Sequence, residues 1–234
     1  MGSTRRTAIA IGAFFLLTHI TSIASMVLYG PVLSSTDYGS YLAGDGASGK
    51  ALFGALLEVV LSLAIVGTGV AFFPVVRRIN EGMALGYAAL RTLEAGVIAV
   101  GVTPLVAAVA LAQGTGTTGN AGLIQALAAI HNWTFIVGPG LICPANTAVL
   151  AAVLLRSGLV PRIIPILGLV GAPLVFAVNV WQLFALTPQA PSSFSLAVVP
   201  IFAWEVSLAL YLIIRGFRGA AVAKSRSTQP AMAR

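Results

Sequence analysis

Six long apolar stretches alternate with short polar connections along this chain. They are expected at residues 7–28, 51–76, 82–112, 124–155, 163–186 and 196–214. A helix needs about 20 residues to cross the hydrocarbon core of a bilayer, so each stretch can serve as one span. The pattern predicts an all-α fold, an integral membrane bundle of six transmembrane helices that forms one domain over residues 1–218. The polar residues 219–234 are expected to be a disordered tail.

The connections carry residues that break helices. Gly158 and Pro161 lie in the basic turn Arg156-Ser-Gly-Leu-Val-Pro-Arg162, between the fourth and fifth spans. Residues 113–120 are uncharged and rich in glycine and threonine, which is typical of an external loop. Within the third span, Pro104 removes a backbone donor and is expected to kink the helix.

Basic residues occur at alternate ends of the spans. Two lie at the N-terminus, two after the second span, two after the fourth and five after the sixth, which leaves only Lys50 and Arg91 elsewhere among thirteen. The clustered residues are Arg5, Arg6, Arg77, Arg78, Arg156, Arg162, Arg215, Arg218, Lys224, Arg226 and Arg234. Short cytoplasmic loops concentrate Lys and Arg, so this distribution predicts a bacterial inner-membrane protein with both termini in the cytoplasm.

Composition agrees with a membrane domain. The chain of 234 residues is 58% hydrophobic and 8% charged, with a mean hydropathy of +0.98. Its net charge of +7 is assigned to loops beside anionic lipid headgroups, so no nucleic-acid partner is expected. Its one cysteine, Cys143, excludes an internal disulfide and a multi-thiolate metal site.

An alternative treats Arg5-Arg6 and the first apolar stretch as a cleavable signal, because the twin arginine resembles the start of a Tat leader. Two features favour a retained span. The stretch is longer than the roughly 7–15 residues of a signal core, and Tyr29-Gly-Pro31 is a poor cleavage site. The charge bias does not distinguish the two, since a five-span product keeps the same loops inside.

Ionisable residues inside the apolar spans are the candidates for function. Counting from the expected helix ends places His19, Arg91, Glu94 and Glu205 near mid-depth, and Glu58 and His131 in the outer half. A charged side chain costs at least about 2.5–3.5 kcal/mol at the centre of a membrane helix, so these groups are expected to face one another. Arg91 and Glu94 are three residues apart and share one helix face.

Three glutamates and one arginine leave excess negative charge in the bundle. Either some glutamates carry a proton, or a cation or a water-filled cavity accompanies them. A protonatable glutamate suits proton-coupled transport, whereas an arginine suits an anionic headgroup or a carboxylate substrate. A third interpretation is a buried Arg91–glutamate network that only fixes helix packing.

Patterns typical of enzymes and cofactor sites are weak. His19 and His131 lie on different spans with no His-Glu-x-x-His pair, and no serine lies in a Gly-x-Ser-x-Gly elbow. The glycines at 114, 116 and 119 match a dinucleotide-type spacing without a preceding strand. We therefore expect no cofactor and no metal, and rank an intramembrane metal-dependent hydrolase last.

Several residues together resemble one bacterial multi-pass membrane family, that of domain of unknown function 4386. They are His131-Asn132, Arg91, the turn 156–162, and Glu205-Val-Ser-Leu-Ala-Leu-Tyr-Leu before Arg215-Gly216. The resemblance extends from the N-terminal arginines to about Arg218 and implies the same topology, without an activity. Pro139 and Pro144 depart from the family pattern in the fourth span and raise the question of a pocket shaped by a kink.

The sequence therefore favours a protein that binds or transports a small polar molecule or a lipid through an intramembrane cluster of Arg91, Glu94, Glu58, Glu205 and His131. The alternative is a structural or accessory subunit of a membrane complex. The expected partners are the lipid bilayer and a small-molecule or lipid ligand. The oligomeric state stays open at this level.

Overall fold

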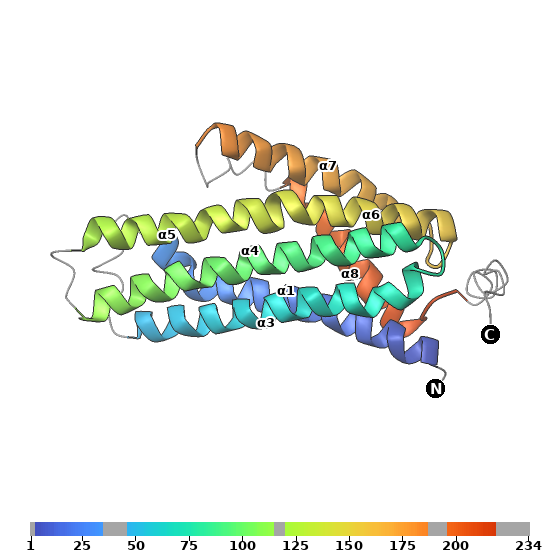
Figure 1. Cartoon of the computed structure of the whole chain (residues 1–234), viewed down its shortest axis with the longest axis horizontal. Helices are drawn as coiled ribbons and strands as arrows, with labels where there is room; N and C mark the ends of the chain where they lie inside the picture. The colour runs from blue at the N-terminus through green and yellow to red at the C-terminus, as the bar shows by residue number, and fades with distance from the viewer. Residues whose placement is uncertain (1–2, 35–45, 115–119, 187–195, 219–234) are drawn as a thin grey trace.

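A computed structural model describes residues 3–34, 46–114, 120–186 and 196–218. Within this part of the chain every regular element is helical, and six helical stretches are long and apolar enough to cross a membrane (Figure 1). The predicted all-α bundle of six membrane-crossing helices is confirmed. The tail 219–234, the loop 187–195 and most of the loop 113–120 lie outside the described residues.

The first three spans are single helices, α1 (Ser3–Ser34), α3 (Ala47–Val76) and α4 (Glu81–Gly114). The fourth span is continuous but has three parts, α5 (Ala121–Phe135), the π-helical segment η1 (Ile136–Ile142) and α6 (Cys143–Ser157). The last two spans are α7 (Ile163–Phe184) and α8 (Val199–Ile214).

The spans form a closed ring in chain order. α1 packs on α3, α3 on α4, α4 on the fourth span, the fourth span on α7, and α7 on α8. α8 then returns to α1 and closes the ring. The start of α1, the end of α8 and the α3–α4 and α6–α7 turns lie at one end of the bundle (Figure 1), here called the basic end because Arg5, Arg77 and Arg156 lie there.

Short-range chemistry ends the helices at the basic end. The Asn80 side chain accepts a hydrogen bond from the Met83 amide at 2.9 Å and caps α4. Gly158 adopts a left-handed conformation, φ +67°, and ends α6, as the sequence predicts. The Arg5 guanidinium donates to the carbonyls of Leu212 and Ile213 at 3.1 and 2.6 Å, which ties α1 to the last turn of α8.

A large apolar core fills the half of the ring nearest the basic end. Its largest fully buried side chains come from α1, α3, α4, α6 and α8: Phe15, Phe72, Tyr87, Leu150, Leu154 and Trp204. Phe72 meets both Phe15 and Tyr87 edge to face, with ring centroids 6.2 and 5.9 Å apart. This core holds the inner halves of the helices in place, and the polar groups described next lie directly against it.

The π-helical segment results from the prolines of the fourth span. Pro139 has no amide hydrogen and its ring crowds the carbonyl four residues earlier, so an α-helical hydrogen bond is lost there. The chain widens into η1, where the Cys143 amide bonds to the Gly138 carbonyl five residues back. Pro139 and Gly140 consequently face the interior of the ring, where they line a cavity.

Candidate functional site

The intramembrane ionisable groups form two separate clusters. The first, the Arg91 cluster, contains Arg91, Glu94, Glu205 and His19, with Thr68 and Asn146 as neutral partners. The second, the Glu58 cluster, contains Glu58, His131 and Tyr29. The five residues predicted to form one site are thus divided three to two, with Arg91, Glu94 and Glu205 in one cluster and Glu58 and His131 in the other.

Arg91 is buried, and two of its three guanidinium nitrogens donate hydrogen bonds. Its Nε donates to the Thr68 hydroxyl at 2.9 Å, and its Nη1 lies 3.0 Å from Glu94 Oε2. The guanidinium also lies 5.2 Å from the centroid of the Phe15 ring, in cation–π geometry. Glu94 accepts a second hydrogen bond from Asn146 at 2.7 Å. The Arg91–Glu94 pair is therefore neutral as a unit and withdrawn from solvent.

Glu205 and His19 are the more accessible members of this cluster, each with a side chain 15% exposed. Glu205 Oε1 lies 3.7 Å from Arg91 Nη2, and its Oε2 lies 3.4 Å from His19 Nε2. Both distances exceed the roughly 2.7–2.9 Å of a direct charge-assisted hydrogen bond. The Glu205 carboxylate is thus held loosely and keeps accepting capacity.

The Glu58 cluster is completely enclosed, since Glu58 and His131 are both 0% exposed. The Tyr29 hydroxyl donates to Glu58 Oε1 at 2.5 Å, and His131 Nδ1 lies 2.9 Å from the Gly101 carbonyl. A carbonyl only accepts, so Nδ1 carries the hydrogen and Nε2 faces Glu58 Oε1 at 3.6 Å. Glu58 Oε1 and His131 Nε2 are then both hydrogen-bond acceptors, and two buried acceptors cannot bond to each other. One of the two side chains must therefore carry an additional proton.

An apolar layer separates the clusters. Glu58 and Thr68 are ten residues apart on α3, which is about 15 Å along a helix axis. Leu61 and Ile65 of α3 and Ala95 and Ile98 of α4 pack together in the interval. The two clusters therefore lie at different depths.

A cavity of about 530 Å³ lies between the spans, on the side of the Arg91 cluster that faces away from the basic end. Residues from all six spans line it, and Arg91, Glu94, Glu205 and His19 form its polar end. The rest of the wall is mostly apolar and includes Met26, Ile98, Phe135 and Ile201. A volume of about 300–1,000 Å³ with mainly apolar walls and a few convergent polar groups is typical of a small-molecule site.

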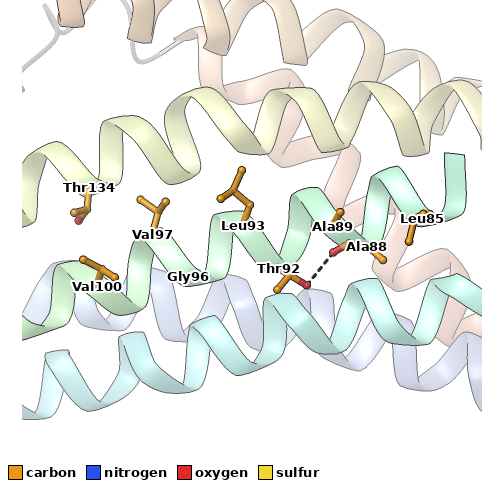
Figure 2. A pocket seen from close by; sticks show the side chains of 9 residues that line it. All are labelled: Leu85, Ala88, Ala89, Thr92, Leu93, Gly96, Val97, Val100 and Thr134. Carbon is orange, nitrogen blue, oxygen red and sulfur yellow. Dashed lines mark hydrogen bonds between the residues drawn. The ribbon is translucent and has the colours of Figure 1, made fainter. Parts of the chain in front are cut away.

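A second hollow is a groove on the outer surface of α4, about 860 Å³ in volume (Figure 2). Its lining runs from Leu85 to Val100, with Thr134 from α5, and contains no charged residue. The Thr92 hydroxyl bonds to the Ala88 carbonyl at 2.9 Å, drawn as a dashed line in Figure 2. The groove therefore presents an apolar face and no chemistry for a polar ligand.

Four residues of the two clusters are not among the five predicted site residues: His19, Tyr29, Thr68 and Asn146. The sequence identifies His19 as an intramembrane group, but its contact with Glu205 depends on the closure of α8 onto α1. Tyr29 and Thr68 carry no local pattern that distinguishes them from other polar residues in the spans. Within the described residues, no group of three or more His, Cys, Asp or Glu is placed to hold a metal ion.

These features define a multi-pass helical membrane protein whose spans border a partly open cavity with one polar end. The chain belongs to the family described as Domain of unknown function (DUF4386), whose model matches residues 10–216. The resemblance noted in the sequence is thereby confirmed, and the match extends over all six spans. Neither a search of curated proteins nor a search of solved structures gave a match.

Replacing Glu58 tests whether a proton lies between Glu58 and His131, here called the shared proton. Glu58→Gln is expected to keep nearly wild-type stability, because an amide NH₂ at the position of Oε1, the atom that faces both neighbours, can donate to His131 Nε2 and to the Tyr29 oxygen. Glu58→Ala removes this contact from two buried groups, the Tyr29 hydroxyl and His131 Nε2, and should cost about 1–3 kcal/mol for each. Thermal unfolding of the detergent-solubilised protein measures both effects.

The control for these variants is Glu81→Ala, at the exposed start of α4, where a change within about 0.5 kcal/mol is expected. Equal destabilisation by Glu58→Gln and Glu58→Ala would show that the cluster requires a charged carboxylate and would contradict the shared-proton interpretation.

Proposed function

We propose that this protein binds or transports a small polar molecule or a lipid headgroup in the cavity above the Arg91 cluster. The observation that carries the proposal is the combination of a partly open volume of about 530 Å³ between the spans, apolar walls and one charged end. Charged groups are costly inside a membrane and commonly mark a ligand or ion pathway. Here four ionisable groups line the cavity, and Glu205 and His19 are the more exposed of them.

We also propose that the protein resides in a bacterial inner membrane with the basic end in the cytoplasm. The arrangement in Figure 1 supports this orientation, because the arginines of two tight turns and of the N-terminal segment gather at one end. Cytoplasmic loops concentrate such residues. In this orientation the cavity extends from mid-membrane toward the outer leaflet, since Met26, Ile98 and Asn179 lie on that side of the Arg91 cluster.

Filling the cavity is the direct test. Ser22 lines it from α1, so Ser22→Phe should occupy part of the volume, whereas Ser22→Ala leaves it open. Untargeted mass spectrometry of extracts from the purified proteins is expected to find a small molecule or lipid enriched with wild type and with Ser22→Ala. The same compound should fall at least about ten-fold in Ser22→Phe, a loss of roughly 1.4 kcal/mol in binding.

The second candidate is a structural or accessory subunit, and the complete pairing of Arg91 with Thr68 and Glu94 favours it. Such a network can serve helix packing alone. Identical extracts from the wild type and from a well-folded Ser22→Phe variant would support this candidate and contradict the binding proposal.

A further inference from the structure

The charges that line the cavity do not balance. Its described lining contains one arginine, two glutamates and one histidine, and no aspartate or lysine. With both glutamates ionised and a neutral imidazole, the sum is one negative charge. An uncompensated carboxylate is expensive in a membrane interior, so a bound group that carries one positive charge would balance the cavity.

Arg91 is not positioned to receive an anion. Its side chain is 3% exposed, and Nε and Nη1 already donate to Thr68 and Glu94. The Phe15 and Tyr87 rings lie 5.2 and 5.9 Å from the guanidinium carbon. The remaining nitrogen, Nη2, faces Glu205 Oε1 at 3.7 Å, so an anionic ligand there would lie beside a second carboxylate. An anion at Nη1 would have to displace Glu94, which would then lie buried without its charge partner.

Glu205 is positioned to receive a cation. Its carboxylate lines the cavity and its two ion-pair contacts, at 3.7 and 3.4 Å, are both long. His19 lies beside it, with Nδ1 2.9 Å from the Phe15 carbonyl, so that in the neutral ring Nδ1 carries the hydrogen and Nε2 is an acceptor. Glu205 Oε2 and His19 Nε2 are thus two neighbouring acceptors, and an ammonium group, which has three donors, can satisfy both.

The rest of the cavity suits an apolar body. The lining beyond Glu205 includes Ile23, Met26, Phe135 and Phe202, and the Phe202 ring lies 5.1 Å from the His19 ring. The other titratable groups that face this region are Arg91, Glu94 and Cys143 from α4 and α6. Arg91 and Glu94 neutralise each other, which leaves Glu205 as the unbalanced charge.

We infer that the ligand of this cavity is a cationic amphiphile, an amine on an apolar body, whose ammonium group binds between Glu205 and His19. The inference rests on the proposed function, because it specifies the chemical class of the ligand of the same cavity. It replaces the anionic headgroup or carboxylate substrate that an intramembrane arginine first suggests.

Three probes of similar size test the sign of the charge: 2-phenylethylamine, 2-phenylethanol and phenylacetate. They are added to the full chain in lipid nanodiscs at about pH 8, where an amine is protonated and a carboxylic acid is ionised. Binding is read from the increase in the thermal unfolding midpoint. A second readout is protection of Cys143, the single cysteine, which lines the cavity, from a methanethiosulfonate reagent. The amine is expected to bind at least about ten-fold more tightly than the other two probes.

Glu205→Gln should abolish the preference for the amine, whereas Glu81→Gln, the same chemical change at the exposed start of α4, should retain it. If Glu205→Gln does not fold, the comparison of the three probes on the wild type still decides. Equal binding of all three, preferential binding of the carboxylate, or no binding would each overturn the inference. The binding proposal itself is judged separately, by the extracts of Ser22→Phe and Ser22→Ala.

Discussion

Arg91→Ala is expected to lower the free energy of unfolding by about 3–5 kcal/mol, the usual cost of breaking a buried ion pair by removing one partner. The substitution leaves Glu94 buried at 3% exposure with only the Asn146 hydrogen bond, and it removes the donor to Thr68. Most of the loss comes from the uncompensated Glu94 carboxylate. Thermal or denaturant unfolding in a defined detergent gives the measurement.

A double variant separates charge from packing. Arg91→Met combined with Glu94→Met removes both charges and keeps much of the volume, so it should recover a large part of the stability lost in Arg91→Ala. Arg78→Ala is the control, because Arg78 is exposed in the α3–α4 turn, and its effect should stay within about 0.5 kcal/mol. A double variant less stable than Arg91→Ala would contradict the assignment of the loss to an unpaired carboxylate.

Gly171→Ala is expected to destabilise the ring by about 3 kcal/mol at the contact between α7 and α8. A Cβ atom at position 171 would meet the backbone nitrogen of Ile201 inside van der Waals distance and lie 2.8 Å from its Cα. Backbone atoms cannot move aside as a flexible side chain can, so the two helices must separate. The fraction of monodisperse protein after heating at a series of temperatures reports the loss.

Gly96→Ala provides a matched control on α4. A Cβ there meets nothing within 4 Å, and alanine favours a helix over glycine by up to about 1 kcal/mol, so stability should be unchanged or rise slightly. A wild-type stability for Gly171→Ala would show that α7 and α8 are less closely packed than described.

The spans and their ends could be predicted from the sequence because both depend on local composition. An apolar run long enough to cross a bilayer forms a helix whatever its neighbours are, since no water is available for its backbone groups. The turn at Gly158 follows from the glycine and proline in its own seven residues. Counting residues from the predicted helix ends also places Arg91, Glu94 and Glu205 at a different membrane depth from Glu58.

The rotation of each helix could not be predicted in this way. Lipid and protein interior are both apolar, so a membrane helix lacks the polar face that orients a helix of a soluble protein. The meeting of His19 with Glu205 requires α8 to pack on α1, 186 residues away in the chain. Likewise, Pro139 indicates an irregular helix, but only the packed ring shows that the π-helical segment borders the cavity.

The unequal lengths of the helices have a consequence for the surrounding lipid. α4, with 34 residues, is about 51 Å long, whereas the last span, Leu196–Ile214 with 19 residues, is about 28 Å long, and a typical hydrocarbon core is about 30 Å thick. The last span fits such a core, so α4 must tilt within it or project beyond it. Acyl-chain length is therefore expected to change the tilt of α4 more than that of α8, and with it the packing of α4 in the ring.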